Sequence, residues 1–180
     1  MDKKWRIRLS GTGGQGVIKG AMILAEAALL DGRNATQSQV YGPESRGGST
    51  RAEVNIADSR ILYPKVEIPN LLLCLSPEAY QKYIDDVSDD AIIILDGDLD
   101  QGALTRPQVY RLPITEIARD KLGKEVAANV VALGVINGIT GILSDEAVNE
   151  SLARSFSEKI LDVNRQAYQL GLLAGKAARE

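Results

Sequence analysis

The sequence predicts an α/β fold, a three-layer, Rossmann-like open sheet with helices on both faces. Three observations support this prediction. Short apolar runs typical of buried strands alternate with longer stretches of helical periodicity. A glycine-rich loop joins the first of these strands to the first helix. No internal repeat, low-complexity segment or linker divides the chain, so we expect residues 1–180 to form a single domain.

The expected strands each follow from a local pattern. Residues 50–56 alternate polar and apolar side chains, which is typical of a half-exposed strand. Residues 71–75 are wholly apolar, which is typical of a strand covered on both faces. Together the expected strands are residues 6–10, 35–40, 50–56, 71–75, 91–95 and 109–112.

The expected helices have recognisable ends. The first, residues 17–30, stops at Asp31, and Ser76 supplies the N-cap that precedes a helix over residues 80–87. Residues 127–142 are apolar nearly all round and carry three glycines, which permit close packing against the sheet or another subunit. This helix is therefore a candidate for an apolar surface that a partner covers. Further helices are expected over residues 114–122 and from Ser144 towards the C-terminus, with a break near residues 155–157.

Composition excludes two classes of function. The net charge is −3, from 21 Lys and Arg against 24 Asp and Glu, which gives no overall basic field for nucleic acid. No apolar run approaches the ~18 residues that span a bilayer, and the N-terminus has no signal-peptide core. We therefore expect a cytoplasmic protein that binds neither nucleic acid nor membranes.

Two residue types limit the chemistry. The sequence has no histidine, which removes the commonest general base, the histidine-activated nucleophiles and His-ligated metal sites. Its one cysteine, Cys74, cannot form an intrachain disulfide or hold an iron–sulfur cluster, which needs about four thiolates. We expect Cys74 to be a small buried hydrophobic residue. No catalytic residue and no metal ligand is assigned to this chain.

The first loop (residues 11–16) has the pattern Gly-x-Gly-x-x-Gly between a strand and a helix. Glycines there allow a tight turn and let a phosphate approach the backbone at a helix N-terminus. NAD or NADP is disfavoured, because Asp31, which has about the spacing of a ribose-binding acid, lies at a helix end instead of a strand end. Two interpretations stay open: a turn that serves only packing, or a site for another phosphate-bearing ligand or a partner's backbone. The candidate binding residues are Gly11, Gly13, Gly14, Gln15 and Gly16.

The second loop (residues 41–48) follows the second expected strand. In a doubly wound sheet it lies at the same carboxyl edge as the first loop, where such sheets bind ligands. Arg46 can fork onto a phosphate or carboxylate, and Glu44 is more suited to an ion pair with Arg46 or Arg51 than to catalysis. Glu44 and Tyr41 are the plausible acid–base groups of this loop. Its candidate binding residues are Tyr41, Gly42, Glu44, Arg46, Gly47 and Gly48.

Two charged clusters have simpler interpretations. Asp96 and Asp98 follow an expected strand and can bind a cation, but turn and cap chemistry is favoured for them. The basic residues near the N-terminus are expected to form a small patch at a solvated edge; they are Lys3, Lys4, Arg6 and Arg8.

With both loops considered, the sequence resembles a known family. The first loop, followed by Gln-Val-Tyr-Gly-Pro-Glu-Ser-Arg-Gly-Gly at residues 39–48, resembles the gamma subunit of 2-oxoacid:ferredoxin oxidoreductases, most closely the 2-oxoglutarate type. Two motifs in this order and spacing are more specific than either alone. The agreement covers roughly residues 5–170 and extends through residues 51–54, 63–65, the strand before Ser76, and residues 129–134.

The resemblance implies one gamma-type domain in an enzyme that converts a 2-oxoacid and coenzyme A to acyl-CoA, CO2 and reduced ferredoxin. Thiamine diphosphate, Mg²⁺ and [4Fe-4S] clusters sit mainly on the other subunits of such enzymes. The implied partners are alpha, beta and ferredoxin-like delta subunits, and ferredoxin itself. We therefore expect a mainly structural or coenzyme A-proximal subunit that is inactive alone and that, when isolated, either exposes a large apolar patch or self-associates to cover one.

Several alternatives remain from the sequence. The same role is possible in an oxidoreductase for pyruvate, a branched-chain 2-oxoacid or indolepyruvate, and a stand-alone nucleotide-binding protein is the alternative from another class. Our hypothesis is that the first loop and Arg46 help to hold the phosphates of coenzyme A or shape its channel. A purely interfacial role for both loops is its competitor.

Overall fold

The computed structural model describes residues 4–40, 49–97, 99, 102 and 104–180. At its centre is a six-stranded sheet in the order β2-β3-β1-β4-β5-β6. Strands β1, β4, β5 and β6 are parallel, whereas β3 is antiparallel to both of its neighbours, β1 and β2. The sheet is therefore mixed. Its strands are β1 (Trp5–Thr12), β2 (Asn34–Val40), β3 (Ser49–Ala57), β4 (Leu71–Cys74), β5 (Ile92–Asp96) and β6 (Val109–Leu112).

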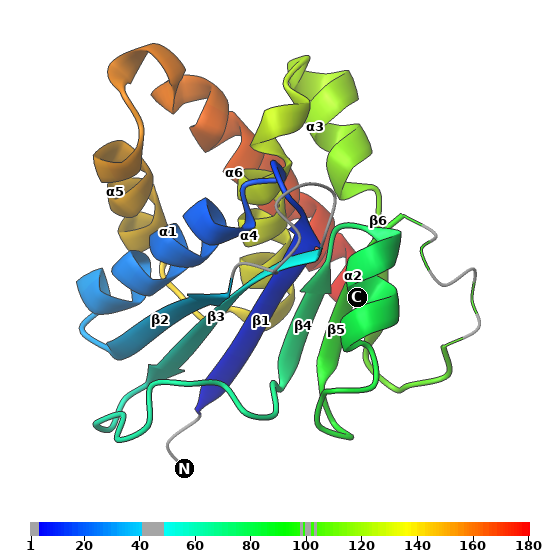
Figure 1. The fold of residues 1–180 in the computed structure, drawn as a ribbon. Coiled ribbons are helices and arrows are strands. Elements are labelled where there is room, and N and C mark those ends of the chain that lie inside the picture. The colour runs from blue at the N-terminus through cyan, green and yellow to red at the C-terminus, as the bar shows by residue number, and fades with distance from the viewer. Residues whose placement is uncertain (1–3, 41–48, 98, 100–101, 103) are drawn as a thin grey trace.

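Helices cover both faces of the sheet, which confirms the predicted three-layer α/β class (Figure 1). The α2 helix lies in front of the sheet, and α1, α4, α5 and α6 lie behind it. The α3 helix packs against α4 and α6. The helices are α1 (Val17–Leu30), α2 (Pro77–Tyr83), α3 (Ile114–Leu122), α4 (Ala128–Thr140), α5 (Asp145–Ser155) and α6 (Glu158–Arg179), with a 3₁₀ turn, η1 (Glu125–Ala127).

Two apolar cores lie on the two faces of the sheet. Along β4, Leu71 and Leu73 belong to the large core under α1 and α4, while Leu72 and Cys74 belong to the smaller core under α2. Successive residues of a strand point to opposite faces, and here a core covers each face, so all four side chains are buried. The predicted doubly covered strand is thereby confirmed.

Helices α4 and α6 meet backbone to backbone. A Cβ added to Gly138 of α4 or to Gly175 of α6 would lie 2.5 Å from a carbonyl oxygen of the other helix. Gly134 and Gly171 are packed in the same way, one turn earlier. The apolar helix expected over residues 127–142 is therefore covered by α6 of the same chain. The expectation that it forms an exposed surface for a partner is wrong.

Serine side chains cap the start of two helices, α2 and α5. The Oγ atom of Ser76 accepts a hydrogen bond from the backbone N–H of Ala79 at 3.2 Å, and Ser144 caps α5 in the same way at 3.1 Å. The predicted helix over residues 80–87 begins earlier and ends at Tyr83. The predicted break near residues 155–157 is confirmed, since α5 ends there and α6 begins. Within the described ranges, no helix combines the length and the apolar character of a membrane span.

Candidate functional site

The first loop is braced by one side chain. The Oε1 atom of Gln15 accepts a hydrogen bond from the backbone N–H of Thr12 at 2.7 Å, and its Nε2 donates to the carbonyl of Leu75 at 2.9 Å. Both ends of the amide are thus engaged, one within the loop and one at the end of the neighbouring strand β4. This fixes the loop's shape relative to the sheet.

The glycines of the first loop fall into two groups. A Cβ at Gly11 would lie 2.5 Å from Oε1 of Gln15, and one at Gly16 would lie 2.5 Å from Nδ2 of Asn129, so these two positions serve close packing. Around Gly13 and Gly14 a Cβ would meet none of the described residues within 4 Å. Gly14 also adopts a left-handed φ of 97°, which favours glycine. The backbone at these two residues is therefore open to a ligand, while the packing interpretation holds for the other two.

The first loop ends at the N-terminus of α1. Gly16 is the N-cap and has no side chain that could cap the first-turn N–H groups. Its carbonyl accepts a hydrogen bond from Nδ2 of Asn129 at 3.1 Å, which ties the loop to α4. Unpaired N–H groups and the helix dipole favour an anion at this position.

A hollow of about 220 Å³ lies beside the first loop. Its second wall comes from the start of α3 and from η1, which bring a threonine hydroxyl, a carboxylate and an exposed valine to the glycine backbone. The lining thus mixes glycine backbone and small side chains with one carboxamide and one carboxylate. The residues around the hollow are Gly14, Gln15, Thr115, Glu125, Val126 and Ala128.

The strand register places the two residues that flank the second loop, Val40 and Ser49, at the edge where the first loop lies. Val40, at the end of β2, pairs with Arg51, and Ser49, at the start of β3, pairs with Thr12. Both ends of the connection therefore lie at the carboxyl edge of β1, as predicted. The candidate residues of the second loop lie outside the described residues, as does any ion pair of Glu44; they are Tyr41, Gly42, Glu44, Arg46, Gly47 and Gly48.

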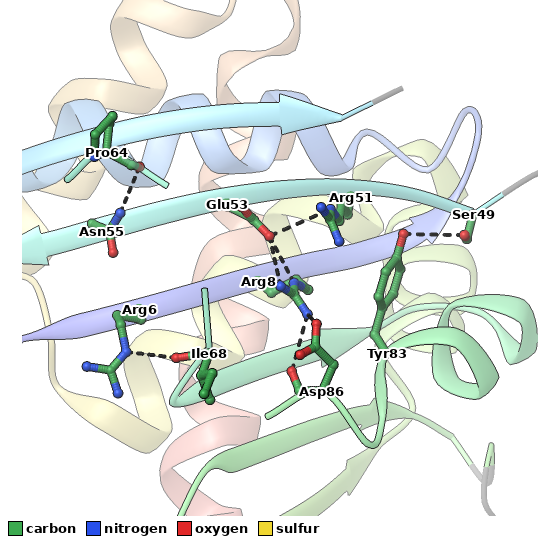
Figure 2. Close-up of polar contacts among 10 residues, drawn as sticks. All are labelled: Arg6, Arg8, Ser49, Arg51, Glu53, Asn55, Pro64, Ile68, Tyr83 and Asp86. Carbon is green, nitrogen blue, oxygen red and sulfur yellow. Dashed lines mark hydrogen bonds and ion pairs between the residues drawn. The ribbon is translucent and has the colours of Figure 1, made fainter. Parts of the chain in front are cut away.

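A buried ionic network lies on the α2 face of the sheet (Figure 2). Arg8 is only 2% exposed; its Nε donates to Oε1 of Glu53 at 3.0 Å and its Nη1 to Oδ2 of Asp86 at 2.5 Å. The prediction that Arg8 belongs to a solvated basic patch is wrong. The prediction that residues 50–56 form a half-exposed strand is also wrong, because β3 lies inside the sheet and α2 contacts its polar face.

The same face gathers cations around one tyrosine. The guanidinium carbons of Arg8 and Arg51 lie 5.5 and 5.7 Å from the centroid of the Tyr83 ring, and the ammonium of Lys82 lies 5.6 Å from it. The Tyr83 hydroxyl lies 3.4 Å from Oγ of Ser49. Arg51 pairs with Glu53 at 3.6 Å and keeps part of its side chain exposed. The backbone of Arg51 pairs with Ser10 in the sheet, and its side chain lies on the α2 face.

Two acidic residues have structural roles. Asp31 accepts hydrogen bonds from the backbone N–H and the hydroxyl of Ser144, at 2.7 and 2.6 Å, so it supports the start of α5 at the far end of α1. Asp96 accepts hydrogen bonds from the backbone N–H of Thr115, at 3.0 Å, and from its hydroxyl, which confirms cap chemistry for this residue. Asp98 lies outside the described residues.

Cys74 is buried, as predicted. Burial raises the pKa of its thiol to about 12, although the hydroxyl of Ser10 and the charge of Arg8 act in the opposite direction. The thiol is therefore protonated at neutral pH and is a poor nucleophile and metal ligand.

Four residues of the site were not found from the sequence: Arg8, Glu53, Asp86 and Asn129. Arg8 and Glu53 are directly opposite each other in the neighbouring strands β1 and β3. Their opposite charges would have indicated this pair if the pairing of the two strands had been known. Asp86 and Asn129 reach the site from segments that only the folded chain brings close.

Comparisons with known proteins agree with this geometry. The family model described as pyruvate ferredoxin/flavodoxin oxidoreductase matches residues 6–174. The KorC subunit of 2-oxoglutarate synthase from Methanocaldococcus jannaschii is 39% identical over 174 residues, which cover 94% of this chain and 93% of that protein.

Solved structures give the same result. The gamma subunit of a keto/oxoacid ferredoxin oxidoreductase from Geobacter sulfurreducens has a TM-score of 0.85 and 38% identity, with 97% of this chain and 99% of that chain covered. A 2-oxoglutarate:ferredoxin oxidoreductase from Magnetococcus marinus shares the fold, with a TM-score of 0.84, 22% identity, and 97% of this chain and 31% of that chain covered. The resemblance found in the two glycine-rich loops is thereby confirmed, and the chain belongs to the pyruvate ferredoxin/flavodoxin oxidoreductase family.

Proposed function

We propose that this chain is the gamma subunit of a cytoplasmic, multi-subunit 2-oxoacid:ferredoxin oxidoreductase. The enzyme converts a 2-oxoacid and coenzyme A to acyl-CoA, CO2 and reduced ferredoxin. The observation that supports this most is the near full-length similarity to KorC. Because KorC is a subunit of 2-oxoglutarate synthase, we propose 2-oxoglutarate as the substrate. Pyruvate, branched-chain 2-oxoacids and indolepyruvate are the alternative substrates.

Redox chemistry belongs to partner subunits in this proposal. An iron–sulfur cluster needs about four thiolates, whereas this chain has the single cysteine Cys74, buried and protonated. Among the described residues, no group of three or more His, Cys, Asp or Glu side chains is placed to hold a metal ion. The residues present therefore do not fit such a cluster, and thiamine diphosphate, Mg²⁺ and [4Fe-4S] clusters are assigned to the alpha, beta and delta partners.

The proposed role of this chain is to hold coenzyme A. The phosphates would lie at the first loop, where the backbone at Gly13 and Gly14 is open and the N-terminus of α1 favours an anion. Arg46 is proposed to supply a positive charge at that edge. The chain thereby binds and orients coenzyme A while partner subunits carry out the decarboxylation.

The test uses the enzyme assembled from this chain and its partner subunits. Gly13→Ala adds a methyl group to the first loop, where it meets no atom of the described residues and requires no left-handed φ. We expect the KM for coenzyme A to rise about tenfold, which corresponds to ~1.4 kcal/mol of lost binding, with the KM for the 2-oxoacid unchanged. Arg46→Ala is expected to act in the same direction.

Gly20→Ala is the matched control. Its Cβ would lie in ordinary contact with Leu9 and Asn129, at 3.8 and 3.9 Å, inside the structure one turn beyond the loop. If Gly13→Ala and Arg46→Ala both leave the KM for coenzyme A at the level of Gly20→Ala, the coenzyme A role is refuted and the interfacial role of the loops takes its place.

A further inference from the structure

The connection between β3 and β4 (residues 58–70) carries large apolar side chains on its outer side. Leu62, Tyr63 and Ile68 are 85, 57 and 54% exposed. The connection runs near the start of β1, at the edge of the sheet opposite the first loop (Figure 1). We call these three residues, with the basic residues Lys4, Arg6, Arg60 and Lys65 around them, the basal patch.

The backbone that carries the basal patch is fixed by side chains of the sheet. Nδ2 of Asn55, in β3, donates to the carbonyl of Pro64 at 2.9 Å, and Nε of Arg6, in β1, donates to the carbonyl of Ile68 at 2.8 Å (Figure 2). Val66 is buried between these two anchor points. The connection is thus held in one shape with its apolar side chains outward, and a fixed surface loses little conformational entropy when a partner binds.

The charge of the basal patch is opposite in sign to that of the chain. Among the described residues, a hollow of about 300 Å³ is lined by Lys4, Arg6, Arg60 and Lys65 and by one carboxylate, Glu67. The whole chain carries a net charge of −3. Four cations around exposed apolar side chains form an apolar centre with a charged rim, which is the usual anatomy of a protein interface.

We propose that the basal patch binds a partner subunit of the oxidoreductase through an apolar segment flanked by aspartate or glutamate residues. This inference rests on the proposed function, because it requires the chain to work inside a complex. Leu62 and Tyr63 line the hollow and Ile68 lies outside it, and a small anion held by the cations would leave most of this exposed apolar surface uncovered. A symmetric pair of copies would bring the four cations of each patch against those of the other, which opposes self-association through this surface.

The test measures assembly of the complex from purified subunits by size-exclusion chromatography and by titration of this chain. Leu62→Asp combined with Ile68→Asp is expected to weaken association at least tenfold. Met22→Asp combined with Leu29→Asp is the matched control, since both leucine-size side chains are exposed on α1, away from the patch. This control is expected to assemble like the wild type, and thermal unfolding of each isolated chain checks that it is folded.

A second variant tests the sign of the charge. Arg60→Glu combined with Lys65→Glu is expected to weaken association at least tenfold at low salt, with a smaller effect at high salt. Equal assembly of this variant and the wild type would refute the acidic partner. Equal assembly of the Leu62/Ile68 variant and its control would refute the patch as an interface.

Two further outcomes separate the possibilities. An isolated wild-type chain that is dimeric, and monomeric once Leu62 and Ile68 are replaced, would show that a second copy covers the patch and would overturn the proposal. If the wild-type chain itself joins no partner, the proposed function fails before the patch is tested. If the wild-type chain forms the complex and the patch variants assemble as well as the Met22/Leu29 control, the proposed function stands. This inference alone is then wrong.

Discussion

At the scale of single residues, the main electrostatic feature is Arg8. A buried guanidinium is stable only when its charge and its N–H groups are matched, and Glu53 and Asp86 do this from a neighbouring strand and from the segment after α2. The two partners differ in exposure, since the side chain of Glu53 is 5% exposed and that of Asp86 is 55% exposed. Their contributions to stability should therefore differ.

We expect Glu53→Ala to lower the free energy of unfolding by about 3–5 kcal/mol, because it leaves the charge of Arg8 buried beside one exposed partner. Asp86→Asn should cost about 1 kcal/mol or less, because water screens that ion pair. Urea unfolding of the isolated chain measures both values. Equal losses of unfolding free energy for the two variants would show that the burial of each partner does not set its contribution to stability.

At the scale of elements, the contact between α4 and α6 depends on four glycines. They let the helix backbones approach so closely that a side chain on either helix would meet a carbonyl group of the other. The same contact holds a polar cluster, in which Asn137 of α4 donates to the hydroxyl of Tyr168 of α6 at 2.7 Å and that hydroxyl donates to Asp145 at 2.6 Å. Burial and the bond to Asp145 raise the pKa of the Tyr168 hydroxyl, so it remains a donor at neutral pH.

We expect Gly171→Ala to destabilise the chain by about 1–3 kcal/mol, since its methyl group meets the backbone of Val131 and the helices must separate. Gly20→Ala, in α1, is the control: its methyl group has ordinary contacts, and the better helix propensity of alanine should stabilise by about 0.5–1 kcal/mol. Thermal unfolding distinguishes the two. A neutral Gly171→Ala would mean that the helices have room to adjust.

At the scale of the whole molecule, the fold separates two surfaces. The first loop and Arg51 lie at the carboxyl edge of β1, and the basal patch lies at the opposite edge. A ligand at one edge and a partner subunit at the other can therefore bind at the same time, which suits a subunit that presents coenzyme A to the rest of an enzyme.

The isolated chain should show no reduction of a redox dye with 2-oxoglutarate and coenzyme A. Its sequence has no histidine, and its one cysteine is buried, so these residue types provide no ligands for an electron-transfer centre. Activity should appear when partner subunits that carry thiamine diphosphate and iron–sulfur clusters are added, and should be low in a mixture that lacks this chain. Dye reduction by the pure chain would contradict the division of roles proposed above.

The sequence by itself determined what depends on neighbours along the chain. The α/β class follows from runs of the right length and periodicity, Ser76 and Ser144 cap helices with their own side chains, and the first loop joins strand to helix as its glycines predict. The family also follows from the sequence, because two motifs in a fixed order identify it. The helix caps and the loop depend on contacts between residues a few positions apart.

Only the tertiary structure decided the features that depend on distant segments. The position of β3 inside the sheet buries Glu53 against Arg8, although the alternation of the strand predicted an exposed face. The glycines of α4 allow close packing in either case, and only the fold shows that α6 occupies that surface. Leu62 is exposed because Asn55 and Arg6 hold its connection in place. Burial is set by which segments meet across the sheet, and a local pattern does not contain that information.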